Sequence, residues 1–322
     1  MIIVQFPQHF AKNALLNRAK IEKSLIIVQF SQHFAKNALL NRAKSKKSLI
    51  LVQFFLHFFF VLWYHEIYSD IVRCFMKNIR SQLNKYNKEL EAIHSELETL
   101  PPGRLAKNGK TYTHIIDNKR FGITKKPALI QQLARKKYLL ARKKQLSSNI
   151  QALSNPNIKY DSRLPQEIIA TFSETYRSLP LSYFYHPSIA TWLEDAYDKN
   201  TLYQENLIYS SKNGIHLRSK SERDIANLLE EYQIPYRYDA IIRPGGIKTS
   251  PDFIIKNPYT NKTIIWEHFG FLHEADYEQN MNDKIDRYLS NGFTENEHFI
   301  YTFEAHTRDL SRVQNLIESM IL

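Results

Sequence analysis

The sequence predicts a mixed α/β (α+β) protein in which helices and a small hairpin precede a domain of alternating helices and strands. Three observations support this class: a heptad pattern of apolar residues over 79–100, an Asn-Gly pair between two β-like runs, and the order of patterns in 217–322. The chain has 322 residues, of which 43% are hydrophobic and 24% charged, enough for one or two domains with real cores.

Charge is divided unevenly along the chain. Residues 1–75 carry a net charge of +7, residues 76–163 of +13 and residues 164–322 of −8. A basic part followed by an acidic part indicates nucleic acid, with phosphates held by the first and a metal ion by the second. The single cysteine, Cys74, excludes an internal disulfide and favours a reducing compartment, so we expect a cytoplasmic protein.

The first 75 residues consist of near-identical repeats. Residues 2–25 and 26–49 differ at three of 24 positions, and a third copy begins at Ile50 and then decays. Because repeat folds usually stack at least three units, we interpret 1–75 as recently duplicated sequence outside the native fold. We expect Met76 to be the natural start.

A mostly apolar run of 16 residues covers 49–64. A membrane-spanning helix needs about 20 such residues, and Gln53 and His57 inside the run would be costly in lipid. The run also begins too far into the chain for a secretory signal peptide. A membrane anchor is therefore the less favoured alternative.

Residues 76–153 are predicted to form a basic helical module with a β-hairpin. Apolar residues from Ile79 to Leu100 alternate in steps of four and three, which predicts one long helix that ends at Pro101. This helix packs on its own domain or forms a coiled coil, with a homodimer through 79–100 left open. The heptad positions are Ile79, Leu83, Tyr86, Leu90, Ile93, Leu97 and Leu100.

The pair Asn108-Gly109 separates two short β-like runs, and Asn-Gly is the strongest short hairpin signal. We expect a third strand around Arg120 and then a helix from Lys125 to about Leu153. Two basic triplets on this helix lie seven residues apart, so they project from the same side. They are either a solvated face or contacts to nucleic-acid phosphates, which give affinity without sequence choice. The candidate phosphate contacts are Arg135, Lys136, Lys137, Arg142, Lys143 and Lys144.

Residues 154–216 contain several prolines and no candidate site residue, and we expect a connector with two or three short helices, one of them near 189–197. The domain 217–322 then begins with Ser219, which can cap a helix together with Glu222 three residues later. We expect that helix to reach about Gln233. The elements that follow are strands at 236–242, 250–255 and 263–268, a helix at 275–290, a strand at 298–303 and a helix at 308–320.

These elements bring three carboxylates into one domain. Glu222 lies on the first helix, and Asp252 and Glu267 lie on two neighbouring strands. Hard oxygen ligands of this kind suit Mg²⁺, which lowers the pKa of a bound water and neutralises charge on a phosphate under attack. The sequence contains no Cys-x-x-Cys or His-x-x-x-His pair for zinc and no phosphate-binding loop of the P-loop type, so we expect no nucleotide cofactor.

The motifs Pro251-Asp252-Phe253 and Trp266-Glu267-His268-Phe269-Gly270, in this order of elements, resemble the core of the PD-(D/E)XK nuclease superfamily. More narrowly, they look like an uncharacterised bacterial and phage-type branch of it. The resemblance implies a restriction-endonuclease-like core (helix, three strands, helix, strand) preceded by a helix–hairpin–helix module. It also implies that the Asp and the Glu bind Mg²⁺, with Mn²⁺ as the alternative, and that Glu222 supports them.

The superfamily also uses a lysine that assists the attacking water. Its Glu-x-Lys pattern would place that lysine at 269, where this chain has Phe269. Some members carry the lysine on the following helix, and Lys284 is the candidate there. It shares one helix face with Tyr277, Asn280 and Tyr288; a plain surface lysine is the alternative.

The function expected from these features is a Mg²⁺-dependent nuclease that hydrolyses phosphodiester bonds of DNA, with Glu222, Asp252, Glu267 and Lys284 as catalytic residues. RNA remains open as a substrate. The alternative is a catalytically inactive nucleic-acid-binding protein with a nuclease-like fold.

Overall fold

The computed structural model describes residues 76–155, 157–270, 275–295 and 297–322, and of 275–278 only the backbone. The expectations for 1–75, including the apolar run and Cys74, lie outside these residues. The described residues belong to two compact units, one of 76–96 with 143–162 and one of 97–142 with 163–322. The expected boundaries after 153 and after 216 do not follow this division. No helix in the described ranges is both long and apolar enough to cross a membrane.

The first unit combines the start of a helix over 76–99 with the end of helix α3 (Pro127–Ser154). All seven heptad positions of the first helix are buried or half-buried, as the spacing predicted. Tyr86, one of them, hydrogen-bonds through its hydroxyl to that of Tyr160. The Asn149 side chain fixes the chain after α3, since it donates to the carbonyl of Asp161 at 2.8 Å and accepts from its N–H at 2.7 Å.

The second unit begins with the predicted hairpin. Strands β1 (Arg104–Asn108), β2 (Thr111–Ile116) and β3 (Lys119–Gly122) form an antiparallel sheet in the order β1-β2-β3. Gly109 adopts a φ of 56° in the first turn, and Asp117 and Asn118 adopt positive φ values in the second. These are the residue types that tolerate the left-handed region.

Helix α3 is confirmed within two residues of its predicted bounds, but its buried side differs from the prediction. Leu140, expected on the apolar side, is 48% exposed. Arg135, expected to contact phosphate, is only 2% exposed and donates to the carbonyls of Phe184 at 2.8 Å and Tyr259 at 2.7 Å. The prediction that Arg135 contacts phosphate is therefore wrong, because its guanidinium is buried and hydrogen-bonds to backbone carbonyl groups inside the fold.

The two lysines of the first triplet also contact other residues of the fold. Lys136 donates to the carbonyl of Pro101 at 2.8 Å, and the exposed Lys137 places its ammonium over the ring of Phe172 at 5.3 Å. In the second triplet Arg142 and Lys143 are half-buried and Lys144 is exposed.

The connector that follows contains α4 (Pro165–Ala170), α5 (Glu174–Arg177), η1 (Leu181–Phe184), α6 (Ser188–Glu194), η2 (Gln204–Asn206) and a ribbon of β4 (Tyr209–Ser210) with β5 (His216–Leu217).

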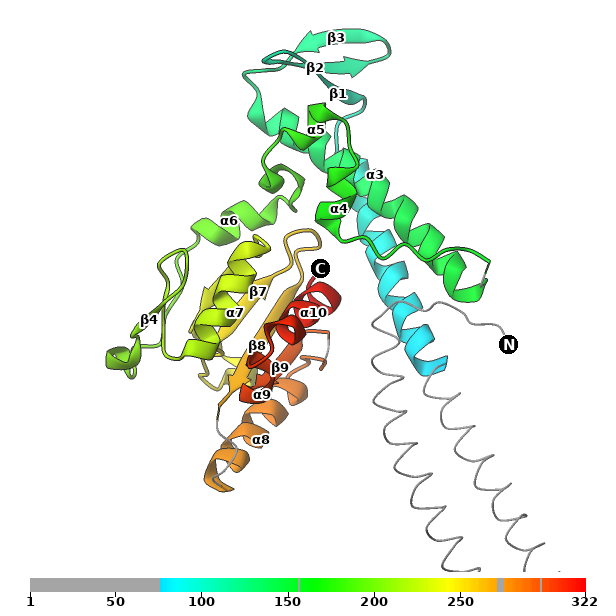
Figure 1. Ribbon diagram of the computed structural model, residues 1–322. Helices are drawn as coiled ribbons and strands as arrows, with labels where there is room; N and C mark the ends of the chain where they lie inside the picture. Colours follow the sequence, from blue (N-terminus) through cyan, green and yellow to red (C-terminus); the bar gives the residue numbers. More distant parts are fainter. Residues whose placement is uncertain (1–75, 156, 271–274, 296) are drawn as a thin grey trace, which may run out of the picture. The chain divides into compact units, whose positions relative to one another are not determined.

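The C-terminal part of the second unit is built around a four-stranded mixed sheet in the order β6-β7-β8-β9, visible behind α7 and α10 in Figure 1. Strand β8 pairs with β7 antiparallel and with β9 parallel, so it is buried between two neighbours. The strands are β6 (Tyr236–Tyr238), β7 (Phe253–Lys256), β8 (Thr263–Phe269) and β9 (Phe299–Phe303), and the helices are α7 (Lys220–Glu231), α8 (Ala275–Ser290), α9 (Glu304–Thr307) and α10 (Leu310–Met320).

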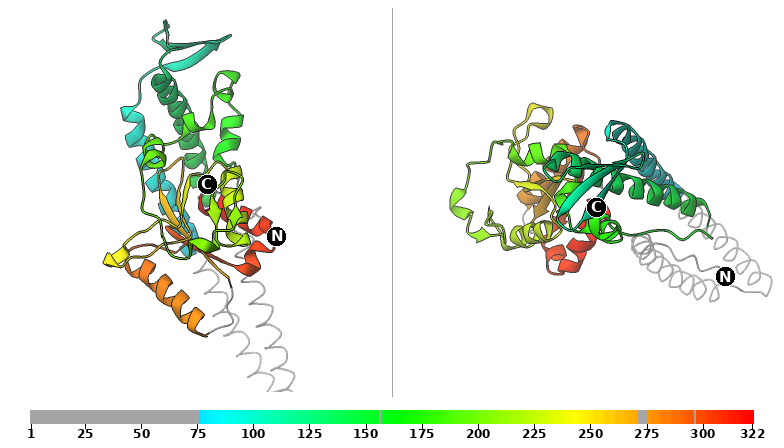
Figure 2. Two further views of the ribbon diagram at one scale, coloured as in Figure 1. Left: turned by 90° about the vertical axis from the view of Figure 1, so that its left-hand side faces the viewer. Right: turned by 90° about the horizontal axis from the view of Figure 1, so that it is seen from above.

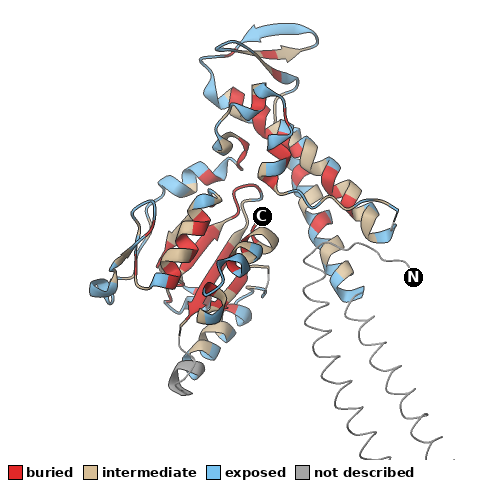
Figure 3. Cartoon of the chain, viewed as in Figure 1, coloured by how far each residue is buried: buried red, intermediate tan, exposed pale blue. Residues whose placement is uncertain are grey.

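Helices pack on both faces of this sheet, as the two additional views in Figure 2 indicate. On one face a large apolar cluster joins the sheet to α7 and α10, with Trp266 fully buried among residues such as Ile225 and Ile317. On the other face Tyr288 of α8 packs with Ile265 and Phe299. The burial colours in Figure 3 accordingly concentrate red on this sheet.

The observed order of helix, three strands, helix, strand and helix matches the predicted order, with two local differences. Strand β6 ends at Tyr238 rather than at 242, because Asp239 takes a left-handed φ of 55° that an extended strand does not permit. Asp252 lies directly before β7 rather than within it, next to Pro251, which has no N–H for a sheet ladder.

We predict that Arg135→Ala lowers the free energy of unfolding by about 2–5 kcal/mol, because it leaves two buried carbonyl groups without their donors. Urea denaturation followed by circular dichroism measures this. Lys144→Ala, at an exposed position on the same helix, is the control and should change stability by less than about 0.5 kcal/mol. Equal effects of the two substitutions would contradict a structural role for Arg135.

Candidate active site

Glu267 is the centre of the candidate site. It lies in β8, between β7 and β9, and is only 1% exposed. One carboxylate oxygen, Oε2, is 2.7 Å from Nζ of Lys284, and the other, Oε1, accepts a hydrogen bond from the Tyr288 hydroxyl at 2.6 Å. Both partners come from α8, so this helix holds the carboxylate with one charge and one hydroxyl.

Asp252 is the second carboxylate and approaches from the neighbouring strand. The register of β7 with β8 pairs Phe253 with Trp266, which places Asp252 beside Glu267 at the end of the pairing. The Oδ2 atom of Asp252 accepts a hydrogen bond from the backbone N–H of His268 at 2.6 Å. The two carboxylates predicted from sequence are therefore brought together by strand register alone.

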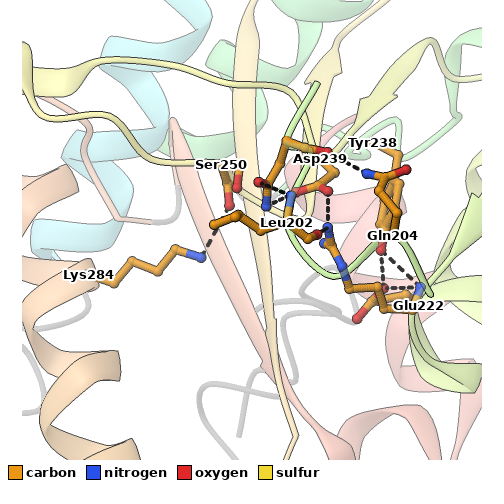
Figure 4. A network of polar contacts seen from close by, with 9 residues as sticks. Leu202, Gln204, Glu222, Tyr238, Asp239, Ser250 and Lys284 are labelled. Carbon is orange, nitrogen blue, oxygen red and sulfur yellow. Dashed lines mark hydrogen bonds and ion pairs between the residues drawn. The ribbon is translucent and has the colours of Figure 1, made fainter. Parts of the chain in front are cut away.

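Lys284 contacts Glu267 and also the backbone of Ser250, with Nζ 3.4 Å from the Ser250 carbonyl oxygen. Figure 4 shows the contact with Ser250. The helix face predicted from spacing is thus found in part. Lys284 and Tyr288 both contact Glu267, Asn280 is exposed, and the side chain of Tyr277 lies outside the described residues.

Glu222 is the third carboxylate and lies in the first turn of α7. Its backbone N–H donates to the Oγ of Ser219 at 3.1 Å, so the predicted helix cap is present. Its Oε2 accepts from the Tyr238 hydroxyl at 2.6 Å and from the N–H of Arg218 at 3.2 Å (Figure 4). Glu222 therefore combines a structural role with a position close enough to influence Asp252.

The charges of the site act on one another. Removal from water raises the pKa of Asp252 well above its usual range, and the neighbouring carboxylates of Glu267 and then Glu222 raise that pKa further. Burial also raises the pKa of Glu267, while Lys284 lowers it through its charge and hydrogen bond. Burial and the adjacent Glu267 raise the pKa of the Tyr288 hydroxyl, so that it stays a hydrogen-bond donor.

His268 follows Glu267 in β8 and its imidazole lies on the opposite face of the sheet, as strand alternation predicted. Its Nδ1 is 2.9 Å from Oγ1 of Thr302, and its Nε2 is 3.3 Å from Oε2 of Glu304. Thr302 also accepts from the indole N–H of Trp266 at 2.9 Å. These contacts anchor the strand segment whose backbone orients Asp252.

The donor set fits a divalent cation held by few protein ligands. The carboxylates of Glu267 and Glu222 both act on Asp252, and one ammonium group contacts Glu267, so negative charge is in excess. A site of two carboxylates with additional waters is the usual protein environment of Mg²⁺. Asp252 and Glu267 would be its ligands. Within the described ranges there is no group of three or more His, Cys, Asp or Glu side chains arranged to hold a metal ion by themselves.

Sequence reasoning placed Tyr288 on the helix face of Lys284 but gave it no role at Glu267, and it missed Tyr238. Tyr288 had a signal, since it follows Lys284 by one helical turn. Tyr238, which donates to Glu222, had none. The ion pair between Arg218 and Asp239, beside Glu222, was also missed, because only the folded chain brings these residues together.

Comparison with known proteins adds little to this geometry. No protein-family model matches the chain, and no solved structure matches it. A stretch of 92 residues, 28% of the chain, is 36% identical to an uncharacterised protein of Methanocaldococcus jannaschii. The match covers 8% of that protein's length.

We predict that Asp252→Asn stabilises the metal-free protein at neutral pH. A carboxyl whose pKa is raised by folding contributes stability below its unfolded pKa, and that contribution is lost as the pH rises through its folded pKa. The amide has no charge to ionise and can still accept from His268. In thermal unfolding with EDTA, the melting temperature of the variant should exceed that of the parent at pH 7. This difference should become smaller towards pH 4.

Asn315→Asp, on the exposed surface of α10, is the control for an Asp–Asn difference without burial. A melting temperature of Asp252→Asn that is equal to or below that of the parent at every pH would contradict the raised pKa.

Proposed function

We propose that this protein is a metal-dependent nuclease that hydrolyses phosphodiester bonds of DNA, with a restriction-endonuclease-like core. Two features support the core. Helix α7 precedes three antiparallel strands, and α8 then leads to β9, which pairs parallel with β8. The motifs that resemble the PD-(D/E)XK superfamily lie at the adjoining ends of β7 and β8. The hairpin that lies in the sequence between the helix of 76–99 and α3 supports the proposed helix–hairpin–helix module.

The single observation that carries the proposal is the 2.7 Å contact between Nζ of Lys284 and Oε2 of Glu267. The superfamily pattern requires a lysine beside this carboxylate, and the position two residues after Glu267 is occupied by phenylalanine. A lysine from α8 supplies the missing charge from another element. A surface lysine would not converge with Tyr288 on one buried carboxylate.

The roles of the side chains follow from their contacts. Asp252 and Glu267 would hold Mg²⁺ or Mn²⁺, which supplies charge neutralisation for the phosphate and a more acidic bound water. Lys284 holds a positive charge where a water can be oriented and where negative charge develops on phosphate oxygens. Tyr288 fixes the rotamer of Glu267 through its hydroxyl. Glu222 adds negative charge beside Asp252, which favours cation binding.

The energetic cost of burying these carboxylates favours an active enzyme over the alternative of an inactive nucleic-acid-binding protein. Buried carboxylates with raised pKa values destabilise a fold at neutral pH. Groups with such perturbed pKa values concentrate at functional sites. A protein that only binds nucleic acid has no need for Asp252, Glu267 and Lys284 in contact, because phosphate binding requires positive charge.

We predict that the protein of residues 1–322 cleaves DNA with Mg²⁺ and that Asp252→Asn, Glu267→Gln and Lys284→Met each lower kcat by about 100-fold or more. Glu222→Gln should have a smaller effect, since Glu222 acts through Asp252. Cleavage of single-stranded, double-stranded and branched DNA and of RNA is followed on denaturing gels.

The matched control is Lys212→Met, which disrupts an exposed lysine–glutamate pair with Glu231 in the same unit. It should retain full activity. Undiminished activity of the Asp252 and Glu267 variants would show that the catalytic site lies elsewhere. Salt-sensitive DNA binding without cleavage on any substrate would favour the inactive nucleic-acid-binding alternative.

A further inference from the structure

The three-stranded sheet β1-β2-β3 carries positive charge that has no role in the candidate active site. Residues 104–126 contain seven basic side chains and one acidic side chain, Asp117. Six of the cations are exposed, and within the described ranges none of the six takes part in an ion pair. They are Arg104, Lys110, Lys119, Arg120, Lys125 and Lys126. Strand β3, which is exposed along its whole length, is pale blue in Figure 3.

Strand register gathers these cations at both ends of the sheet. Arg104 and Arg120 both pair with Ile115, from opposite sides, so they project from one face of the sheet about 10 Å apart. Lys119, the first residue of β3, pairs with Ile116 at the same end of the sheet, and its side chain projects from the opposite face. This group of Arg104, Lys119 and Arg120 is called the arginine end below.

The opposite end of the sheet carries the other three cations. The N–H of Ile123 donates to the carbonyl of Tyr112 at 2.9 Å, and Thr124 Oγ1 accepts from the N–H of Tyr112 at 2.8 Å. These bonds bring Lys125 and Lys126 back beside the first turn, which contains Lys110. Strand β2, with six residues, separates the two ends by about 20 Å.

We propose that this basic sheet is a binding surface for the phosphate backbone of duplex DNA, with the arginine end as its main contact. Duplex DNA presents one negative charge per about 1.7 Å of its axis, so a stretch of duplex about 20 Å long carries on the order of ten phosphates, and those on one side of it face the sheet. Rigid strands hold the cations at fixed spacings, which suits a duplex of regular geometry. The contacts give affinity and orientation but no sequence choice.

Two observations select a duplex rather than a single strand, and this sheet rather than α3. Proteins that bind single strands stack bases on aromatic side chains, and the sheet face of Arg104 and Arg120 otherwise carries only non-aromatic residues: Ala106, Asn108, Thr111, Thr113, Ile115 and Gly122. In α3, by contrast, Arg135 is buried and Lys136 is bonded to the backbone. The choice of DNA rests on the proposed function, while the binding itself does not require catalysis.

The test is fluorescence anisotropy of a labelled duplex of about 20 base pairs, titrated with the full chain in EDTA across a range of salt concentrations. We predict that the triple variant Arg104→Gln, Lys119→Gln and Arg120→Gln weakens binding by about tenfold or more. The slope of log K against log salt should fall by about 2 to 3, because each lost phosphate contact removes about 0.9. Arg104→Lys with Arg120→Lys, which keeps the charges, should retain most of the slope.

The matched control removes three exposed cations from the helix of 76–99: Lys77→Gln, Arg80→Gln and Lys88→Gln. Its slope should change by less than about one. Circular dichroism and thermal melting show whether each variant is folded. The inference is overturned if the two triple variants lose the same slope, if neither loses any, if a single strand of equal length binds more tightly, or if anionic vesicles bind and DNA does not.

Because the assay is done without metal, its outcome is independent of cleavage. Loss of cleavage in Asp252→Asn with unchanged duplex binding would leave this surface in place. Duplex binding by the sheet in a protein that never cleaves would instead remove only the nuclease proposal.

Discussion

The contact between the carboxylate of Glu267 and the ammonium of Lys284 is the interaction on which the site depends. Glu267 occupies a strand with neighbours on both sides and is nearly inaccessible to solvent. An isolated carboxylate there would be very costly, and the ammonium at 2.7 Å with the hydroxyl of Tyr288 at 2.6 Å offsets that cost. Helix α8 must therefore pack on this face of the sheet in one register, which Tyr288 fixes from within the apolar cluster.

The compensation of negative charge is incomplete. Asp252 lies beside Glu267 and within the influence of Glu222, and one lysine cannot balance all three carboxylates. Burial first, and then the remaining negative charge, raises the pKa of Asp252 and disfavours its ionised form. A divalent cation would relieve the same repulsion, so the instability of the metal-free site and the proposed binding of a cation share a physical origin.

Much of this was predictable because the signals were local. The cap at Ser219, the turn at Asn108-Gly109 and the extent of α8 depend on neighbouring residues, and strand alternation correctly separated Glu267 from His268. The placement of Lys284 followed from its helical spacing to Tyr288. Each of these depends on one element and its own periodicity.

The failures concern residues whose role is set by distant parts of the chain. The two basic triplets of α3 are identical in sequence, and nothing local shows that Arg135 donates to the carbonyls of Phe184 and Tyr259. The hydroxyl of Tyr238 donates to Glu222, which lies 16 residues earlier in the chain. The left-handed φ of Asp239 ends β6 before the predicted residue. Tertiary contacts override local pattern at these positions.

The most direct test of the central claim is a titration with Mn²⁺ in the presence of a short DNA duplex, with free Mn²⁺ measured by electron paramagnetic resonance. If Asp252 and Glu267 hold a catalytic cation, the protein should bind at least one Mn²⁺ that Mg²⁺ displaces, and Glu267→Gln should lose that ion while Lys212→Gln keeps it. Identical binding by the protein and its Glu267→Gln variant would contradict a metal site at these carboxylates.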